Sequence, residues 1–159
     1  MMQANLPDNL EQKVNIIKTF NKQSLDLISQ MVDLVGDNEL YQLKRKFSLV
    51  IKVNSTKPIK EFINRIYNYK NQIINKDESF FLSNQETIYK KQNIDLVDNL
   101  LDKNNSDDSA NFVKSLKLDQ VWNSLSDKSK NNIWDYFSIL ILLCDKYIDY
   151  KINKRGFYN

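Results

Sequence analysis

Residues 133–148 read IWDYFSILILLCDKYI and contain the longest apolar run of the chain, residues 137–144, in which Ser138 is the single polar residue. Eight helical residues extend about 12 Å, whereas the hydrocarbon core of a bilayer is about 30 Å thick, so the run cannot cross a membrane. Because residues 139–143 cover every side of a helix, we expect this helix to lie at the centre of a bundle. Two alternatives remain, namely an uncovered face for a partner or for self-association, and contact with a membrane surface.

The rest of the chain is also typical of helices. Its 159 residues, 42% hydrophobic and 27% charged, are enough for one folded domain, and two Gly and two Pro are too few for the many turns of a β-sandwich. Apolar residues at three- and four-residue spacing predict helices over about 8–35, 38–53, 57–75, 88–101 and 127–153, with a penultimate helix marked by Leu116 and Trp122. We therefore predict an all-α, single-domain helical bundle of five to seven helices with a central hydrophobic C-terminal helix.

Local signals set the expected boundaries. Gly36 fits the position after the first helix, which is one long helix or two with a break near Asn21. Ser55 or Thr56 would cap the third helix, and Pro58 would lie in its first turn. In the connection that follows, we expect two phenylalanines to tuck back into the core, Phe80 and Phe81. Within the domain, 1–159, residues 102–111 predict a mobile loop and residues 154–159 a frayed tail.

Several classes of enzyme lack the residues they need. The chain has no histidine and one cysteine, Cys144, which excludes Ser-His-Asp and Cys-His nucleophile systems and thiolate metal cages. Gly36 and Gly156 stand isolated, so no glycine-rich phosphate loop is present. We therefore predict that the protein is not an enzyme and uses no cofactor.

The acidic residues give no convincing metal or acid–base site. Alternating oxygen ligands of the kind found in an EF-hand start at Asp102, but Asp107 occupies the required glycine position and Val113 the position of the closing glutamate. We predict no metal site. The neighbouring acids Asp77 and Glu78, like the pair Asp95 and Asp98, are better explained as helix caps or solvated surface.

The charge distribution is strongly asymmetric. Residues 41–76 carry nine basic residues against Glu61 alone, whereas residues 77–127 carry ten acids and five lysines. If the second and third helices present their charges on one face, that face would attract an anionic partner. The candidate binding residues are Lys44, Arg45, Lys46, Lys52, Lys57, Lys60, Arg65 and Lys70.

Three interpretations of this basic stretch remain open. The cations could neutralise the acidic half of the chain or stand solvated, bind an acidic protein, or bind nucleic acid with Tyr41, Tyr67 and Tyr69 stacking on bases. Only three of the 23 basic residues are arginines, so any nucleic-acid binding would be of low specificity through phosphates. Trp122 and Trp134 follow helical spacing, which favours burial in the core over a role as recognition anchors.

Two stretches carry a resemblance to known proteins. FINRIYNYKNQIINKDESFFL, residues 62–82, and IWDYFSILILLCDKYI, residues 133–148, resemble segments of small all-helical proteins of nucleocytoplasmic large DNA viruses, the mimivirus and phycodnavirus group. The resemblance implies a viral protein of the cytoplasm or the virion, without an assigned activity, and transfers no functional residue. A second comparison, with poxvirus Bcl-2-like proteins, concerns fold class only, because the nearest groove-like string, VWNSLS at 121–126, lacks both Gly and Arg.

These observations favour a non-enzymatic interaction or structural protein that contacts a partner through a basic helical face. The partner is an unknown protein or a second copy of the chain, and the alternative is a low-specificity nucleic-acid-binding protein that uses Lys-rich helices on phosphates. A single cysteine in an apolar run and the lack of a signal-peptide-like stretch in the first thirty residues favour a cytoplasmic location.

Overall fold

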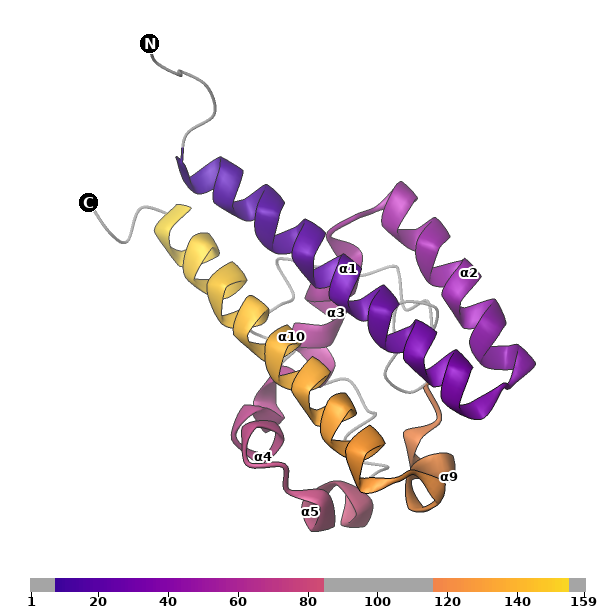
Figure 1. The fold of residues 1–159 in the computed structure, drawn as a ribbon. Coiled ribbons are helices and arrows are strands. Elements are labelled where there is room, and N and C mark those ends of the chain that lie inside the picture. The colour runs from indigo at the N-terminus through magenta and orange to yellow at the C-terminus, as the bar shows by residue number, and fades with distance from the viewer. Residues whose placement is uncertain (1–7, 85–115, 155–159) are drawn as a thin grey trace.

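The computed structural model describes residues 8–84 and 116–154, and every regular element within these two ranges is helical (Figure 1). The seven α-helices and two 3-10 helices of the described ranges are α1 (Asp8–Val35), α2 (Asn38–Val53), α3 (Lys57–Arg65), η1 (Tyr67–Tyr69), α4 (Lys70–Ile74), α5 (Glu78–Ser83), α9 (Leu118–Val121), η3 (Trp122–Ser124) and α10 (Asp127–Lys154). The all-α prediction is confirmed.

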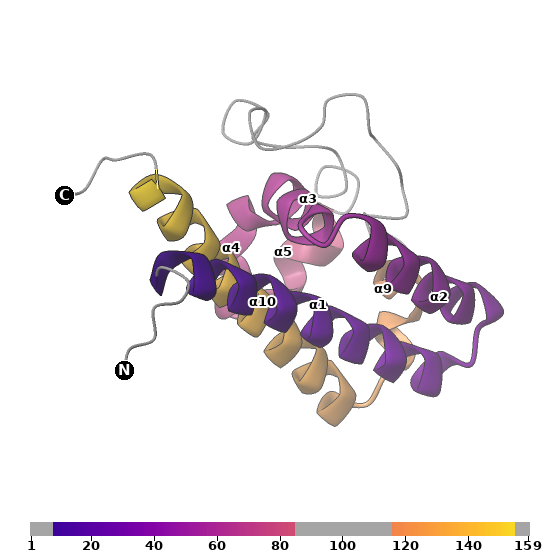
Figure 2. The same cartoon turned by 90° about the horizontal axis from the view of Figure 1, so that it is seen from above.

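The two longest helices, α1 and α10, lie side by side and antiparallel as one layer, with α3 behind them (Figures 1 and 2). Each has 28 residues, which corresponds to a length of about 42 Å. Helix α1 is continuous, so the alternative of a break near Asn21 is wrong. Asn21 is buried, and its side-chain amide donates a 2.9 Å hydrogen bond to the carbonyl of Ser55, which ties α1 to the start of α3.

Helix α10 supplies a large part of the core, but neighbours do not surround it on every side. Leu140 and Ile141 are fully buried, and the ring of Phe137 stacks on Phe62 of α3 at 6.1 Å between centroids. In contrast, Ile139 is 40% exposed and Leu142 is 54% exposed. The expected complete enclosure is therefore wrong for one side of the helix, because α1, α3 and α4 all pack on its other sides.

Glycine chemistry ends α1 where the sequence indicates. Gly36 has a φ of 71°, a left-handed conformation, and its N–H donates a 2.8 Å hydrogen bond to the carbonyl of Val32. Asp37 then caps α2 by accepting a 2.7 Å hydrogen bond from the backbone N–H of Glu39. Helix α2 packs on α1 and α3 through Leu40, Leu43 and Phe47, and forms an edge of the molecule (Figure 2).

The third expected helix is shorter than predicted. Pro58 lies in the first turn of α3, as expected, and Thr56 occupies the N-cap position, but its side chain makes no capping hydrogen bond. The helix ends at Arg65 and not near residue 75. A 3-10 turn, η1, follows, and α4 begins only at Lys70. The break directs Tyr67 toward α10, where its hydroxyl donates a hydrogen bond to Asp145.

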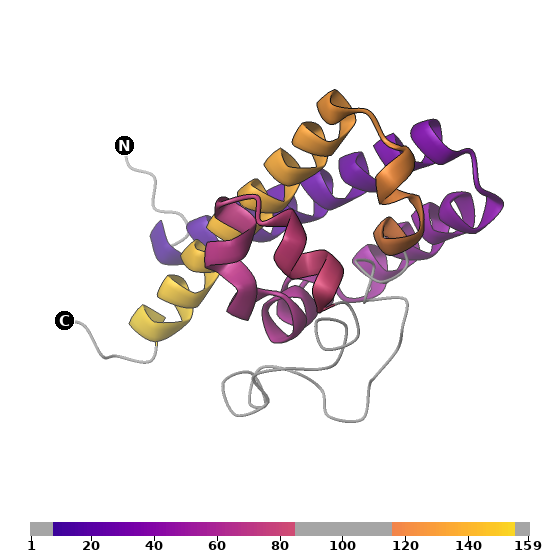
Figure 3. The same cartoon turned by 90° about the horizontal axis from the view of Figure 1, so that it is seen from below.

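The remaining elements lie on one side of the α1–α10 pair, the side that faces the viewer in Figure 3. Phe80 and Phe81 lie in α5 and pack against the core, as predicted. The ring centroids of Phe81 and Trp134 are 5.6 Å apart. The N-terminus of α5 is capped by the side chain of Asp77, which accepts from the N–H of Phe80. Ser126 caps α10 by accepting a 3.1 Å hydrogen bond from the N–H of Ser129.

The described part of the penultimate region contains only α9 and η3, short helices that carry Trp122 into the core. Trp122 and Trp134 are both buried and pack edge to face, at 5.6 Å between centroids, which confirms their expected place in the core. The predicted helix over 88–101, the predicted loop over 102–111 and residues 155–159 of the predicted tail lie outside the described residues.

Candidate functional site

The structure does not bring the eight candidate basic residues together on one face. Arg45, Lys46 and Lys52 are exposed on α2, and Lys44 beside them is half-buried. Among the described residues, none of these four has an acidic group within ion-pair distance. Within the described residues, no ion pair therefore neutralises these four charges.

The cations of α3 are buried or half-buried. Lys57 is buried, and Lys60 is half-buried. Desolvation by burial, with a smaller repulsion from Lys13, lowers the pKa of the Lys60 ammonium. Arg65 pairs with Glu61 one helical turn earlier, with 3.1 Å between Nε and Oε1, and both side chains are largely buried. These three cations therefore present less charge at the protein surface than the exposed cations of α2.

Lys70 belongs to a polar cluster between α4 and α10. Its Nζ lies 2.9 Å from Asp145 Oδ2 and 5.9 Å from the ring centroid of Tyr67. The other oxygen of the Asp145 carboxylate accepts the hydrogen bond from the Tyr67 hydroxyl. Burial, and then this hydrogen bond, raise the pKa of Tyr67 well above its ordinary value, so the phenol stays protonated at neutral pH.

The exposed side of α2 combines cations with apolar side chains. Tyr41, Arg45, Leu49 and Lys52 follow one another at four-, four- and three-residue spacing, which places them on one side of the helix. Tyr41 is 50% exposed and Leu49 is 61% exposed. Together with two bordering residues they form what we call the α2 outer face, namely Tyr41, Arg45, Lys46, Leu49, Lys52 and Val53.

Leu49 and Val53 of the α2 outer face were not singled out from the sequence as surface residues. Val53 is 87% exposed at the last position of the helix, although valine usually avoids such a position. The signal that could have found Leu49 and Val53 is their offset from the buried positions Leu40, Leu43 and Phe47 on the helical wheel.

The tyrosines expected to stack on bases are divided in the same way as the cations. Tyr41 is exposed, but Tyr67 is engaged by Asp145, and Tyr69 packs against the rings of Phe80 and Phe81 at 5.7 Å and 6.2 Å between centroids. Only Tyr41 of the three therefore offers a ring face beside the exposed cations of α2.

The described residues contain little else that resembles a reaction centre. Cys144 is fully buried, and burial raises the pKa of its thiol well above the ordinary value, so it is a poor nucleophile. Within residues 8–84 and 116–154, no three acidic or cysteine side chains gather as metal ligands would. In the same ranges, no helix combines the length and the apolar character that spanning a bilayer requires.

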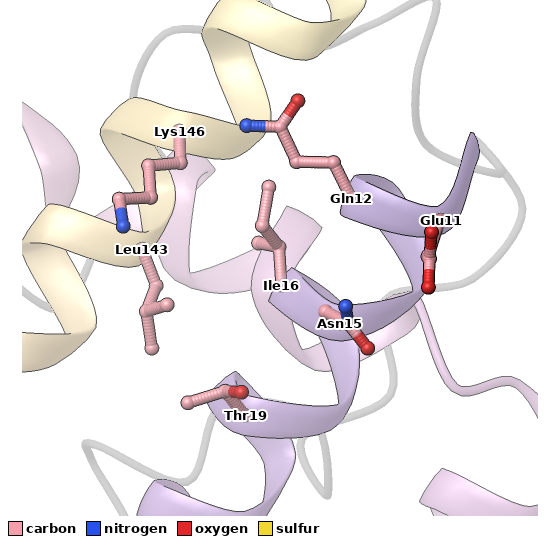
Figure 4. A pocket seen from close by; sticks show the side chains of 7 residues that line it. All are labelled: Glu11, Gln12, Asn15, Ile16, Thr19, Leu143 and Lys146. Atoms are coloured by element: carbon pink, nitrogen blue, oxygen red, sulfur yellow. The ribbon is translucent and has the colours of Figure 1, made fainter. Parts of the chain in front are cut away.

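An open groove of about 490 Å³ lies between α1 and α10 (Figure 4). Ile16 from α1 and Leu143 from α10 supply its apolar surface, while Gln12 reaches from α1 toward α10 and Lys146 borders the groove on α10. The groove is lined by residues of α1 and α10 and by none of α2. It contains none of the eight candidate residues.

The described part of the chain thus defines an all-α helical bundle with a cationic and apolar surface on α2. The chain is similar to an uncharacterised protein of Acanthamoeba polyphaga mimivirus, with 24% identity over 142 residues that cover 86% of this chain and 72% of the mimivirus protein. No family model matches the chain, and no solved structure matches it significantly. The similarity confirms the resemblance to uncharacterised proteins of giant viruses that the sequence indicated.

Proposed function

We propose that the protein is a non-enzymatic interaction protein that contacts an acidic surface of a partner protein through the α2 outer face. The observation that carries the proposal is the combination of Arg45, Lys46 and Lys52, which lack acidic partners in the described structure, with the exposed side chains of Tyr41 and Leu49. Cations attract and orient an acidic partner, and the apolar side chains between them supply area that is removed from water on contact.

The apolar component favours a protein partner over nucleic acid. Binding to phosphates strengthens with the number of cations that contact them, whereas contact of Leu49 and Val53 with a phosphate backbone adds no favourable binding free energy. With three exposed cations on the face, a nucleic-acid complex would show a slope of log affinity against log salt of about −3 for a duplex. The nucleic-acid alternative therefore predicts weak binding at physiological salt.

The proposal is tested by affinity capture with the full-length tagged protein from native or infected cells, with and without nuclease. Four forms are compared: the wild type, the triple variant Arg45→Glu, Lys46→Glu and Lys52→Glu, the apolar variant Leu49→Ser, and a control, Lys18→Glu. Lys18 is an exposed lysine on α1, so the control repeats one charge reversal away from α2. We expect nuclease-resistant companions that the wild type and the control retain and both α2 variants lose.

Two results would contradict the proposal. Companions that survive in both α2 variants would place the contact on another surface. Capture that nuclease abolishes, combined with a salt slope near −3 on a labelled oligonucleotide, would favour the nucleic-acid alternative.

The same reasoning extends to the origin and location of the protein. We infer that it is a viral protein of the host cytoplasm or the virion, and that it uses no cofactor or metal. The similarity to a mimivirus protein supports a viral origin, and the single buried Cys144 suits a reducing compartment.

A further inference from the structure

The exposed side of α10 carries a short ordered pattern that we call the α10 ridge: Asp135, Ile139, Leu142 and Lys146. Spacings of four, three and four residues place these side chains along one side of the helix. The two central residues are the apolar ones, 40% and 54% exposed, and the charged end residues are exposed as well. In the described ranges the neighbouring helices lie beside and behind α10, which leaves this side open (Figures 1 and 2).

The groove between α1 and α10 borders the ridge. Lys146 belongs to both features, and Leu143, the next residue after Leu142, contributes to the groove together with Ile16 of α1 (Figure 4). A helix laid along the ridge would therefore also cover the mouth of this 490 Å³ groove.

The order of charges along the ridge is acidic, apolar, apolar, basic, and this order is complementary to itself when reversed. In an antiparallel pair of ridges, Ile139 of each copy faces Leu142 of the other, and Asp135 of each copy faces Lys146 of the other. A parallel pair would instead place acid on acid and base on base. We propose that the α10 ridge is the contact surface of a homodimer in which two copies of α10 pack antiparallel about a twofold axis.

The charged ends of the ridge are not held by strong ion pairs within the described residues. Lys146 has no acidic group within ion-pair distance among the described residues. Asp135 has one cation nearby, Lys76, with 3.8 Å between Nζ and Oδ1, and both side chains are well exposed, so water already screens this pair. Each end can therefore take a new partner at little cost.

The dimer should be reversible and weak. A standard interface buries about 1,600 Å² in total, and a ridge of four side chains with its flanking groove supplies less than that. The contact therefore forms at high local concentration, as in an assembly, more readily than in dilute solution.

Sedimentation velocity on the full-length protein tests the proposal at concentrations from about 5 to about 500 µM, a range that includes dissociation constants of tens to hundreds of micromolar. We expect a concentration-dependent monomer–dimer equilibrium. Asp135→Lys alone, and Lys146→Asp alone, should each raise the dissociation constant at least about tenfold, because like charges then face each other at both ends. The double variant should restore it, since the reversed pattern is again self-complementary, and a mixture of the two single variants should form heterodimers.

Leu142→Ser tests the apolar centre and should also weaken the dimer, while Lys18→Glu is the matched control that should not. Circular dichroism checks that each variant folds; the substituted positions are exposed, so folding should be retained. A wild type that stays monomeric at every concentration would overturn the proposal. So would a dimer unaffected by Leu142→Ser, or a double variant that fails to recover association. Loss of dimer through the α2 triple variant instead would assign self-association to the α2 outer face.

Discussion

Tyr67 and Asp145 are 78 residues apart in the sequence, and a hydrogen bond from the tyrosine hydroxyl to the aspartate carboxylate joins them. The contact connects η1, the turn that interrupts the third expected helix, to the second half of α10. Lys70 holds the other oxygen of the same carboxylate at 2.9 Å, so the carboxylate binds a donor on each side. This cluster positions η1 and α4 against the C-terminal helix.

Tyr67→Phe should therefore lower stability without changing the fold. The substitution removes the hydroxyl but keeps the ring, and a partly buried hydrogen bond to a charged group is worth about 1 to 2 kcal/mol of unfolding free energy. Urea denaturation followed by circular dichroism measures the loss. Asp145→Asn should cost at least as much, because it also weakens the ion pair with Lys70. An unchanged midpoint for Tyr67→Phe would show that the contact contributes nothing to stability.

Tyr147, which lies on α10, should make the unfolding free energy fall at alkaline pH. The ring of Tyr147 is fully buried, its hydroxyl has no hydrogen-bond partner within the described residues, and burial raises the pKa of its phenol from 10.0 to about 12. A folded pKa above the unfolded one means that the contribution is complete below about pH 10 and is lost as pH rises toward 12. Unfolding free energy of the wild type should thus decrease above pH 10.

Tyr147→Phe isolates this effect. Between about pH 8 and pH 11, the variant should lose roughly 1 kcal/mol less than the wild type, because it lacks the one proton whose pKa is raised on folding. At neutral pH, the variant should be as stable as the wild type or more stable, because it removes an unsatisfied buried hydroxyl. Identical pH profiles for the two proteins would refute the argument. Tyr67, whose pKa is also raised, accounts for part of the remaining slope.

The sequence predicts much of this fold because its local signals are strong. Apolar spacing and Gly36 define α1 and α2, and Ser126 marks the start of α10. The break after Arg65 has no comparable local signal, because the residue that Tyr67 contacts lies on α10. Likewise, the composition of residues 139–143 indicates that the helix is apolar, but it does not indicate how many other helices pack against it.

The candidate site could be predicted only in part for the same reason. The spacing of Glu61 and Arg65 is enough to suggest their ion pair, since residues four apart lie on one helical face. The pairing of Lys70 with Asp145, in contrast, depends on the packing of two distant helices. Only the three-dimensional arrangement distinguishes Arg45, Lys46 and Lys52, which are exposed, from the cations of α3, which are buried or half-buried.

Two leucines on α10, separated by one residue, test which of its sides form the core. Leu140 is fully buried, so Leu140→Ala should cost about 2 to 5 kcal/mol of unfolding free energy through lost apolar contact and the cavity left behind. Leu142 is more than half exposed, so Leu142→Ala should cost less than about 1 kcal/mol. Denaturation at low protein concentration keeps association out of the comparison. Equal losses at the two positions would show that α10 is enclosed on every side after all.

Backbone conformation predicts stability changes of opposite sign at two residues. Gly36 has a φ of 71° with no atom near the position of an added Cβ, so Gly36→Ala should cost about 1 to 2 kcal/mol through backbone strain alone. Lys76 has a φ of 53° although it carries a side chain, so Lys76→Gly should relieve strain and raise stability by up to about 1 kcal/mol. The exposed 3.8 Å pair with Asp135 that this variant loses is worth little. Thermal unfolding of both variants measures the two shifts, and a loss of stability in Lys76→Gly would show that the ion pair or chain entropy outweighs the strain.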